Sequence, residues 1–417
     1  MNAAARRPYV LALLPHVIPS TILTVVKPLT RLHRSGRIVA DITLEAHGSP
    51  RQIARADAVV FSRNSEPEHG GLLECAVSLG KPVIYDIDDN FFELPAFYPR
   101  ERRHLTAERV RQLERYLRAA CLVRVYSQPM QERASQFNSR VARVDGPIDW
   151  NLVPETPPPR DPQRVRIVYA TSRFDDELAQ LFLPDLRRIL DTYAGRISVC
   201  FWGFEPPELR GRADVEFRPF VPDYDRFFRR FARAGFDIGL APLRDDVFHR
   251  SKSNNKFREY AAARIAGVYS KVDVYTSCVE QERTGMLVAD EPGAWYAAIS
   301  RLIDDRGLRT RIQTEAYTQA RAQYGLEQMS ATWLEQITSL LGAQAATSTA
   351  RAAPSGAAGV DRMHALRRAV YLLGAMRRHG IRATVNRIRR TAKDWRLLLR
   401  VRWQLHGARL FFPPNRR

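Results

Sequence analysis

Cysteine is scarce in this chain of 417 residues, and its cysteines lie far apart. There are four of them, with no short spacing between any two: Cys75, Cys121, Cys200 and Cys278. Structural zinc sites and disulfide frameworks both need cysteines at short, regular intervals. The sequence therefore argues against either kind of site and predicts a reducing, cytoplasmic location.

Long apolar runs are also absent. No stretch of about 18 consecutive apolar residues occurs, so the sequence predicts no membrane-spanning helix. The opening segment RRPYVLALLPHVIPSTILTVV places two arginines before apolar residues, but prolines and a histidine interrupt it and no small-residue cleavage site closes it. We therefore interpret YVLALLP as a first buried strand rather than as part of a secretion signal.

The positive charge of the chain is concentrated at one end. The formal net charge is +20, and residues 361–417 contribute +14 of it, with 16 lysines and arginines against two aspartates. The other 360 residues carry only +6. The strong basicity thus describes the partner of this tail and not the partner of the main fold.

Two segments of biased composition divide the chain. VPETPPPRDPQR (153–164) has five prolines and predicts a stiff linker. AQAATSTARAAPSGAAG (343–359) is rich in small residues and predicts a flexible linker. The predicted organisation is a first domain at 1–152, a linker at 153–165, a second domain at 166–342, a linker at 343–360 and a basic tail at 361–417.

Both predicted domains alternate short apolar runs with amphipathic stretches. The first contains the runs YVLALLP, IVADITLE, ADAVVFS, KPVIYDID, LVRVYS and VARVDG, and the second VRIVYATS, ISVCFWG, VEFRPF, FDIGLAPL, AGVYS and GMLVAD. Helical patterns separate them, as in HGGLLECAVSLG and ERVRQLERYLRAA. Continuous apolar runs are typical of strands buried on both faces. The predicted class is α/β, with two Rossmann-like doubly wound domains facing across a cleft and a basic helical tail.

The segment SKSNNKFREYAAARIAG (251–267) carries charges at helical spacing. Lys252, Lys256 and Glu259 are four and three positions apart, which places them on one face of a helix. Ser251 and Ser253 are both suitable N-caps. Because the segment follows the run FDIGLAPL, its start lies at the carboxyl end of a strand, where doubly wound sheets bind ligands.

This arrangement suits a nucleotide-sugar. Lys252, Lys256 and the helix N-terminus would attract a diphosphate. Glu259 would accept hydrogen bonds from ribose or sugar hydroxyls. The alternative is an ordinary solvated helix on which Lys256 and Glu259 form an ion pair.

A longer stretch around this segment resembles a known family. APLRDDVFHRSKSNNKFREYAAARIAGVYS and ERTGMLVADEPGAWYAAISRLIDDRGLRTRI are similar to the donor-binding half of GT-B glycosyltransferases, in particular glycosyltransferase family 4 (glycosyl transferases group 1) of bacterial polysaccharide synthesis. The resemblance covers residues 166–342 and extends more loosely to GKPVIYDIDDNFFELP. It implies that Glu259 holds the nucleotide ribose and that nearby basic residues bind the diphosphate of a UDP-, GDP- or dTDP-sugar.

The resemblance also implies a reaction. A sugar would pass from the nucleotide-sugar to a saccharide acceptor in bacterial surface polysaccharide synthesis, with retention of anomeric configuration. No cofactor and no metal ion would be needed, because lysines and the helix N-terminus would stabilise the leaving diphosphate.

This chain departs from the family pattern at several positions. Ser251 stands where the family often has a second glutamate that touches the donor sugar, and Asp245 or Asp246 could replace it. Arg264 and Ala266 stand where the family has a glycine and a proline after the helix. These departures leave open a rival function, a catalytically degenerate GT-B scaffold or binding protein of a membrane glycan assembly complex. A nucleotide-sugar epimerase of the same fold is a further alternative.

The segment VYATSRFDDE opens the second domain without a glycine-rich loop. It offers Ser172 and Arg173 at the carboxyl end of a predicted strand. Both are candidate nucleotide-sugar contacts. The alternative for Arg173 is an ordinary surface arginine.

Three carboxylates follow a predicted strand of the first domain. YDIDD (85–89) contains Asp86, Asp88 and Asp89, which are the candidate catalytic residues. One of them could accept the proton of an acceptor hydroxyl or orient the acceptor. A metal-binding pair is disfavoured because such sites belong to a different glycosyltransferase architecture. The structural alternative is a turn and cap for NFFELP.

The tail has the pattern of a basic amphipathic helix. Its candidate membrane contacts are Arg389, Lys393, Trp395, Arg396, Arg400 and Trp403. Arginines beside tryptophans are typical of a helix on an anionic membrane surface, here the inner face of the cell membrane with a lipid-linked acceptor. The alternative is a helix packed on the protein itself or on a partner. Nucleic acid is not expected, because no aromatic–basic recognition motif accompanies the charge.

Overall fold

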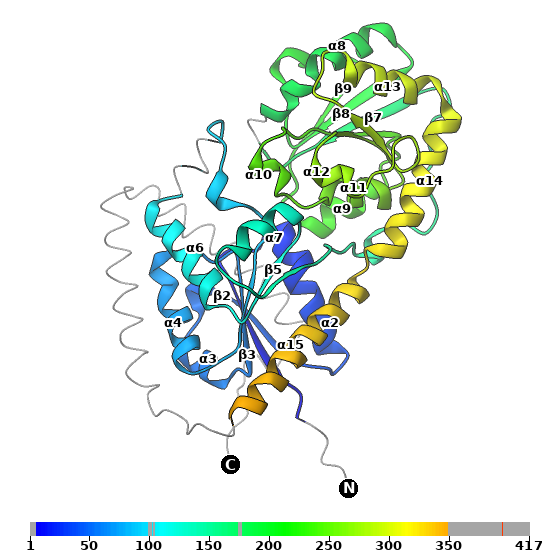
Figure 1. Cartoon of the computed structure of the whole chain (residues 1–417). Coiled ribbons are helices and arrows are strands. Elements are labelled where there is room, and N and C mark those ends of the chain that lie inside the picture. Colours follow the sequence, from blue (N-terminus) through cyan, green and yellow to red (C-terminus); the bar gives the residue numbers. More distant parts are fainter. Residues whose placement is uncertain (1–5, 99–101, 103–104, 174–176, 349–393, 395–417) are drawn as a thin grey trace. The chain divides into compact units, whose positions relative to one another are not determined.

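The computed structural model describes residues 6–98, 102, 105–173, 177–348 and 394 (Figure 1). Within these residues the chain divides into two compact units. Unit 1 comprises the chain up to Asp145 and the described residues from Glu327 onward, and unit 2 comprises Gly146–Leu326.

Unit 1 is built on a parallel sheet of six strands. Their order across the sheet is β2-β1-β3-β4-β5-β6. The strands are β1 (Tyr9–Leu14), β2 (Val39–Leu44), β3 (Ala58–Ser62), β4 (Val83–Asp86), β5 (Leu122–Val125) and β6 (Val141–Arg143). Every pairing is parallel, so all six carboxyl ends lie at one edge of the sheet.

Helices cover both faces of this sheet. The unit contains α1 (Pro19–Thr21), α2 (Lys27–Arg34), α3 (Pro50–Arg55), α4 (Gly70–Ser78), α6 (Ala107–Ala119) and α7 (Gln128–Ser135). Side chains of β1 alternate between two cores, with Leu11 and Leu13 on one face and Val10 and Ala12 on the other. Both faces of the strand are therefore buried, which explains its uninterrupted apolar sequence.

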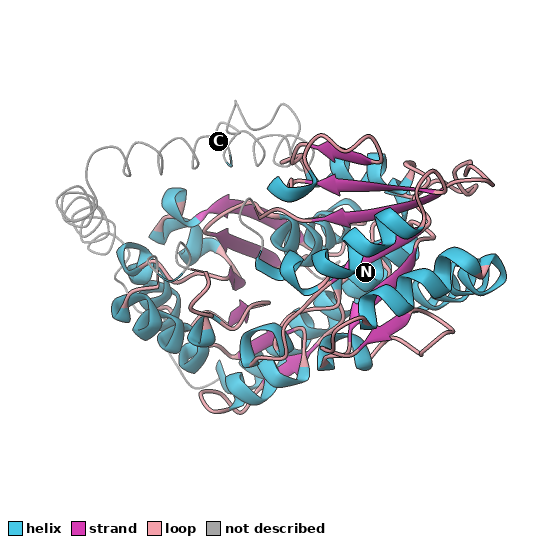
Figure 2. Cartoon of the chain, turned by 90° about the horizontal axis from the view of Figure 1, so that it is seen from above, coloured by secondary structure: helices cyan, strands magenta, loops and turns pink. Residues whose placement is uncertain are grey.

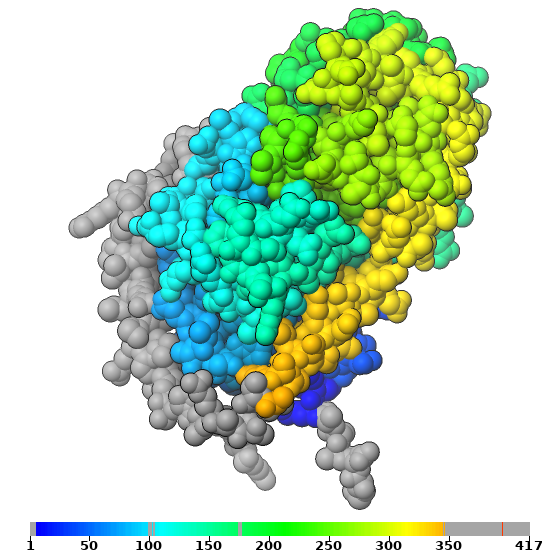
Figure 3. Space-filling view, in the orientation of Figure 1, coloured from blue at the N-terminus to red at the C-terminus, as the bar shows by residue number. Residues whose placement is uncertain are grey.

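The last helix closes the core of unit 1. α15 (Leu326–Ser348) packs Met329, Trp333 and Ile337 into the same core as Val10 and Ala12. These three residues recur every four positions and form one stripe of the helix. Figure 3 shows α15 (orange) lying along the surface of unit 1.

A buried cation holds α15 against the sheet. The guanidinium carbon of Arg124 lies 3.8 Å from the ring centroid of Trp333, and one of its nitrogens lies 3.0 Å from the sulfur of Met329. Trp333 in turn donates its indole N–H to the carbonyl of Thr24 at 2.7 Å. Strand β5, helix α15 and the segment before α2 are thereby joined.

Unit 2 is built on a second parallel sheet, with the order β12-β11-β10-β7-β8-β9. The strands are β7 (Val165–Ala170), β8 (Ile197–Trp202), β9 (Val215–Arg218), β10 (Ile238–Ala241), β11 (Ala266–Ser270) and β12 (Met286–Val288). Counted from β7, this is the strand order 6-5-4-1-2-3 of dinucleotide-binding sheets. The strand order reverses between β7 and β10.

The helices of unit 2 are mostly short. They are α8 (Leu183–Thr192), α9 (Tyr224–Ala232), α10 (Val247–Arg250), α11 (Asn255–Ala262), α12 (Asp273–Thr276), α13 (Ala294–Asp304) and α14 (Arg306–Gln323). Figure 2 shows helices flanking the strands. One large core joins α8 and α13 to the sheet through residues such as Leu186, Phe201 and Ile299.

The predicted α/β class with two doubly wound domains is confirmed, since each of the twelve predicted apolar runs contains one strand of the structure. The predicted helical tail lies outside the described residues. In addition, none of the helices in the described part of the chain is long and apolar enough to cross a membrane.

The predicted linear division into domains differs from the observed one. The proline-rich segment does not separate the units but packs within unit 2, where Arg160 donates to the carbonyl of Phe236 and lies 3.4 Å from Asp237. The second predicted domain was expected to reach residue 342, but the chain returns to unit 1 at Glu327. α15 also runs six residues past that limit, to Ser348.

We expect Trp333→Ala to destabilise unit 1 by about 3–5 kcal/mol, because it leaves a large cavity and removes the ring beneath Arg124. Chemical denaturation measures this change. The matched control, Ser339→Ala on the exposed face of the same helix, should change stability by less than about 0.5 kcal/mol. Equal stability of the two variants would contradict the anchoring role of Trp333.

Candidate functional site

The predicted donor residues of unit 2 come from the loops at the point where its strand order reverses. Ser172 and Arg173 follow β7, and Asp245 follows β10. Ligands of doubly wound sheets bind at such a point, outside the carboxyl ends of the strands. Gly203 at the end of β8, with φ +95°, permits close approach here, since a Cβ would lie 1.9 Å from the carbonyl oxygen of Thr171.

A buried histidine lies among the basic residues of this edge. The Nδ1 atom of His249 lies 2.8 Å from a carboxylate oxygen of Asp246, which also accepts the backbone N–H of His249 and so caps α10. Burial, with smaller contributions from the charges of Lys252 and Arg173, lowers the pKa of His249 to about 4 against the opposing effect of Asp246. His249 is therefore neutral at pH 7, and the positive charges of Arg173 and Lys252 both act on it.

The position of Lys252 corrects a prediction. Lys252 does not belong to the helix that carries Lys256 and Glu259, because α11 begins at Asn255. Ser251 is not its cap either: it is buried, ends α10, and donates its hydroxyl to the carbonyl of Val247 at 2.7 Å. Lys252 instead lies in the turn between α10 and α11, with its Nζ 4.3 Å from the ring centroid of Phe248.

Lys256 and Glu259 do share a face of α11. Their charged atoms are 2.9 Å apart, and the Glu259 side chain is only 14% exposed. The hydroxyl of Tyr224, at the start of α9, is hydrogen-bonded to Glu259, and burial together with this carboxylate raises the pKa of Tyr224 well above its usual range. The ion pair between Lys256 and Glu259, which was predicted for an ordinary solvated helix, is thus present. The helix that carries it, however, is largely buried.

Asp245 has a partner of its own. Arg250 donates to both of its carboxylate oxygens, at 2.5 and 2.9 Å, and these hydrogen bonds lower the pKa of Asp245. Ser172 is exposed, and Arg173 donates its backbone N–H to the hydroxyl of Thr171 at 3.2 Å. Two aspartates could replace the missing glutamate. Asp245 is exposed, and the carboxylate of Asp246 is hydrogen-bonded to His249.

The end of α11 forms normally despite the absent glycine. Arg264 has φ +54°, the left-handed conformation that usually requires glycine. Its N–H donates to the carbonyl of Ala261, and the N–H of Ile265 donates to that of Tyr260, which is the Schellman pattern of hydrogen bonds. The Arg264 guanidinium lies 3.6 Å from the ring centroid of Tyr317, a contact that offsets the backbone strain.

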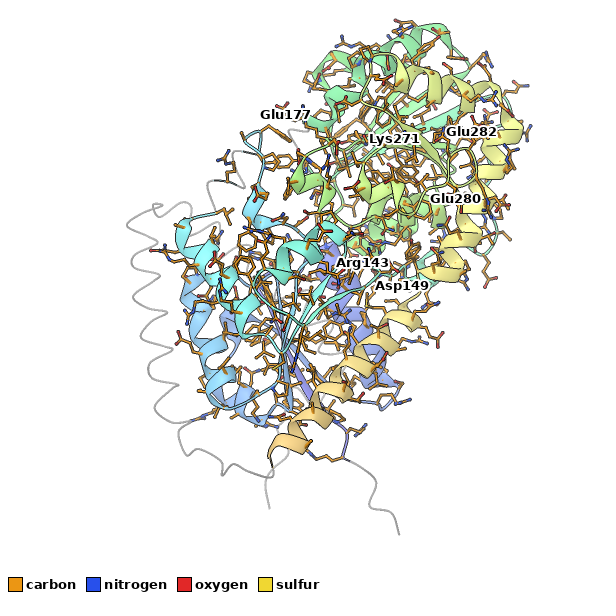
Figure 4. The ribbon with its side chains drawn as sticks, in the orientation of Figure 1. Arg143, Asp149, Glu177, Lys271, Glu280 and Glu282 are labelled. Atoms are coloured by element: carbon orange, nitrogen blue, oxygen red, sulfur yellow. The ribbon has the colours of Figure 1, made fainter. Side chains whose placement is uncertain are left out.

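Sequence reasoning missed two residues of unit 2, Lys271 and Tyr224. Lys271 follows β11 directly and is exposed at the carboxyl edge of the sheet (Figure 4). No carboxylate of the described residues pairs with it. A lone lysine after the run AGVYS was the only available signal. Tyr224 had none, because its contact with Glu259 joins distant parts of the sequence.

In unit 1 the structure separates the three predicted catalytic aspartates. Asp86 is buried and accepts hydrogen bonds from Tyr126 at 2.5 Å, Arg124 at 3.2 Å and Ser62 at 3.3 Å. Burial raises its pKa, although Arg124 opposes the shift. Asp86 thus serves the internal network beneath α15, and its carboxylate does not face solvent.

Asp88 and Asp89 bind one arginine together. Both form ion pairs with Arg63, the second at 3.1 Å, and Arg63 is a non-glycine residue with φ +61°. Burial alone would lower the pKa of Arg63, but the two aspartates raise it above its usual value. The two carboxylates are partly exposed, at 11% and 22%, at the carboxyl edge of the unit 1 sheet.

The predicted membrane contacts of the tail lie outside the described residues. Within the described ranges, no group of three His, Cys, Asp or Glu side chains is placed to hold a metal ion.

No known sequence family matches the chain, and no curated protein does. Solved structures do match it. Anabaena Alr3699/HepE, in complex with UDP and glucose, aligns with a TM-score of 0.58 at 12% identity, over 80% of this chain and 100% of that one. The sucrose-phosphate synthase of Thermosynechococcus elongatus gives 0.58 at 12% identity, over 81% and 100%. A glycosyltransferase from Rickettsia africae ESF-5 gives 0.57 at 11% identity, over 81% and 99%.

This chain has the GT-B fold. The predicted resemblance to GT-B glycosyltransferases is thereby confirmed at the level of the fold. The predicted donor residues Arg173, Lys252 and Glu259 all belong to unit 2, in the loops and the helix that follow its strands.

The depressed pKa of His249 predicts a pH dependence of stability. A histidine of the unfolded chain has a pKa of about 6.5, and that of folded His249 is about 4, so the unfolded state binds more protons between these values. The contribution of neutral His249 to the free energy of unfolding is fully present above pH 6.5. It is lost as the pH falls toward 4, by up to about 3 kcal/mol.

Chemical denaturation between pH 4.5 and 7 measures this slope. His249→Asn should flatten it relative to the wild type, whereas His47→Asn, at an exposed histidine, should leave it unchanged. An unchanged slope in His249→Asn would show that His249 is not held neutral by the fold.

Proposed function

We propose that this protein is a glycosyltransferase that moves a sugar from a nucleotide-sugar donor to a saccharide acceptor. The observation that carries the proposal is that Arg173 and Lys252, whose positive charges both act on the buried, neutral His249, follow strands β7 and β10, between which the strand order of the second sheet reverses. Cations at this position suit a diphosphate. Crystals of the structural neighbour Alr3699/HepE contain UDP or UDP-glucose, which makes a uridine donor the first to test.

The proposed roles follow from the geometry. Arg173 and Lys252 neutralise the diphosphate as it leaves, an electrostatic effect that needs no rearrangement during the reaction. Glu259 accepts hydrogen bonds from the ribose hydroxyls, and Lys256 and Tyr224 hold its carboxylate in place. His249, neutral and bonded to Asp246, fixes the turn that presents Lys252.

The finer features of the reaction rest on the resemblance to glycosyltransferase family 4. They are retention of configuration, independence of metal ions, and a place in bacterial surface polysaccharide synthesis with a glycan or lipid-linked acceptor. For the acceptor side we propose Asp88 and Asp89, because their carboxylates reach the surface while that of Asp86 is enclosed.

The first test combines donor binding and turnover. A UDP-sugar at about 100 times its Kd should stabilise the wild-type protein by about 2.7 kcal/mol, seen as a rise in Tm. Glu259→Ala should abolish this rise, and Lys252→Ala should lower kcat by about 100-fold because a phosphate-neutralising charge is lost. Arg311→Ala, which removes an exposed charge from α14, is the matched control and should behave as the wild type.

One observation favours a second function, a scaffold or binding protein without turnover. Ser251 stands where similar transferases often have a glutamate, and a serine has no carboxylate to offer a donor sugar. Its hydroxyl is buried and donates a hydrogen bond to the carbonyl of Val247. Donor binding that depends on Glu259, without hydrolysis or transfer of any UDP-, GDP- or dTDP-sugar, would favour this scaffold. If the protein shows neither donor binding nor turnover, both the transferase and the scaffold proposals are wrong.

We also propose that the basic tail binds the anionic inner face of the cell membrane. Removing the residues after Ser348 leaves α15 whole and should abolish sedimentation with phosphatidylglycerol vesicles, because the removed segment carries most of the net charge. Neutral phosphatidylcholine vesicles are the control. Unchanged sedimentation of the truncated protein would show that the tail is not the membrane contact.

A further inference from the structure

Unit 2 has a second basic region, separate from the residues of the donor site. A groove of about 550 Å³ lies between the end of strands β8 and β9 and helix α9. Its wall includes Trp202, Arg218, Val221, Arg229, Arg230 and Arg233. A volume of several hundred cubic ångströms is that of a small-molecule site.

The arginines of this groove are only partly neutralised. Arg218 donates to both oxygens of Glu216, at 2.5 and 3.2 Å, and Arg233 donates to the carbonyl of Arg229 at 3.2 Å. In the part of the chain that the structure describes, no carboxylate pairs with Arg229, Arg230 or Arg233. The groove therefore has an excess of positive charge.

A buried hydrogen-bond donor points to a ligand as well. Trp202 is 4% exposed, yet its indole N–H has no acceptor among the described residues. The guanidinium of Arg218 lies 5.1 Å above its ring, and Phe227 meets the ring edge-on at 5.3 Å. A buried indole N–H normally finds an acceptor. The Trp202 ring lines the groove, so an anion bound among the guanidinium groups would lie beside this enclosed, unsatisfied donor.

We infer that this groove binds a phosphate-bearing ligand, at a site distinct from the donor site. Guanidinium groups bind phosphate through paired hydrogen bonds, and a phosphate oxygen is an acceptor for the indole N–H. The apolar walls, Pro219, Val221 and Ala234, fit the uncharged part of such a ligand. Phe220, 37% exposed beside Val221, extends this apolar surface.

Helix α9 separates the groove from the donor residues. Its first residue, Tyr224, contacts Glu259, while Phe228 and Phe231 on the same face are buried in the core. The groove arginines belong to the later turns of the helix and are exposed. The two sites therefore use different ends and faces of one helix, and the inference does not depend on the proposed transferase activity.

The test is calorimetric titration of the full-length protein with inorganic pyrophosphate, with and without excess UDP. The double variant Arg230→Gln/Arg233→Gln should bind pyrophosphate at least tenfold more weakly than the wild type under both conditions. Trp202→Phe keeps an aromatic ring but removes the N–H donor, and it should weaken binding severalfold. Arg226→Gln is the matched control, because Arg226 is an exposed arginine of the same helix that does not line the groove.

Two results would overturn the inference. The first is a pyrophosphate affinity that is equal in the wild type, the double variant and Arg226→Gln. The second is a loss of pyrophosphate affinity that is equally large in the double variant and in Arg226→Gln, because this would indicate non-specific attraction. The donor site is tested separately by the turnover of Lys252→Ala. A negative result for the groove can therefore be told apart from a negative result for the donor site.

The source of the phosphate is distinguished by a second arm. Sedimentation with phosphatidylglycerol vesicles that is weaker for the double variant than for Arg226→Gln would identify a lipid headgroup. Sedimentation equal in both variants, together with the loss of pyrophosphate binding, would identify a soluble phosphorylated compound. Either result supports a phosphate site in the groove.

Discussion

The buried ion pair of Asp86 and Arg124 organises unit 1. Burying two charges is costly unless their remaining hydrogen-bonding groups are satisfied, and here Tyr126 and Ser62 complete Asp86 while Met329 and Trp333 cover Arg124. Two of these partners belong to α15, so the charge pair is complete only when the chain has passed through unit 2 and returned. The core of the first sheet therefore depends on the end of the described chain.

The carboxyl edges of the two sheets differ in charge. In unit 1 the carboxylates are matched within the unit, Asp86 by Arg124 and the Asp88–Asp89 pair by Arg63. In unit 2 the loops at the corresponding edge carry Arg173, Lys252 and the exposed Lys271 as well as Asp245 and Asp246, of which Asp245 is paired with Arg250 and Asp246 with a histidine that burial keeps neutral. Cations at such an edge attract anionic ligands, and this is the physical basis of the proposed donor site.

Helix α9 gives unit 2 two chemical faces. Tyr224, Phe228 and Phe231 bury one face, and through Tyr224 this face supports Glu259. Arg229, Arg230 and Arg233 line the groove on another face. Four positive side chains in one groove repel one another, and only Arg218 has a carboxylate partner among the described residues. Such a cluster is most stable when an anion is bound, because the anion offsets the repulsion between the arginines. The cluster is therefore better explained by ligand binding than by a contribution to folding.

The sequence by itself determined the twelve strands and the α/β class, because strands buried on both faces must be continuously apolar. It also placed Lys256 and Glu259 on one helix, since helical spacing is a local property. Only the tertiary structure decided that Lys252 lies before that helix, that Asp86 is enclosed by Arg124, and that Met329, 205 positions after Arg124, packs against it. The apolar stripe of α15 requires burial but does not specify which sheet provides it, because that choice depends on contacts between distant parts of the chain.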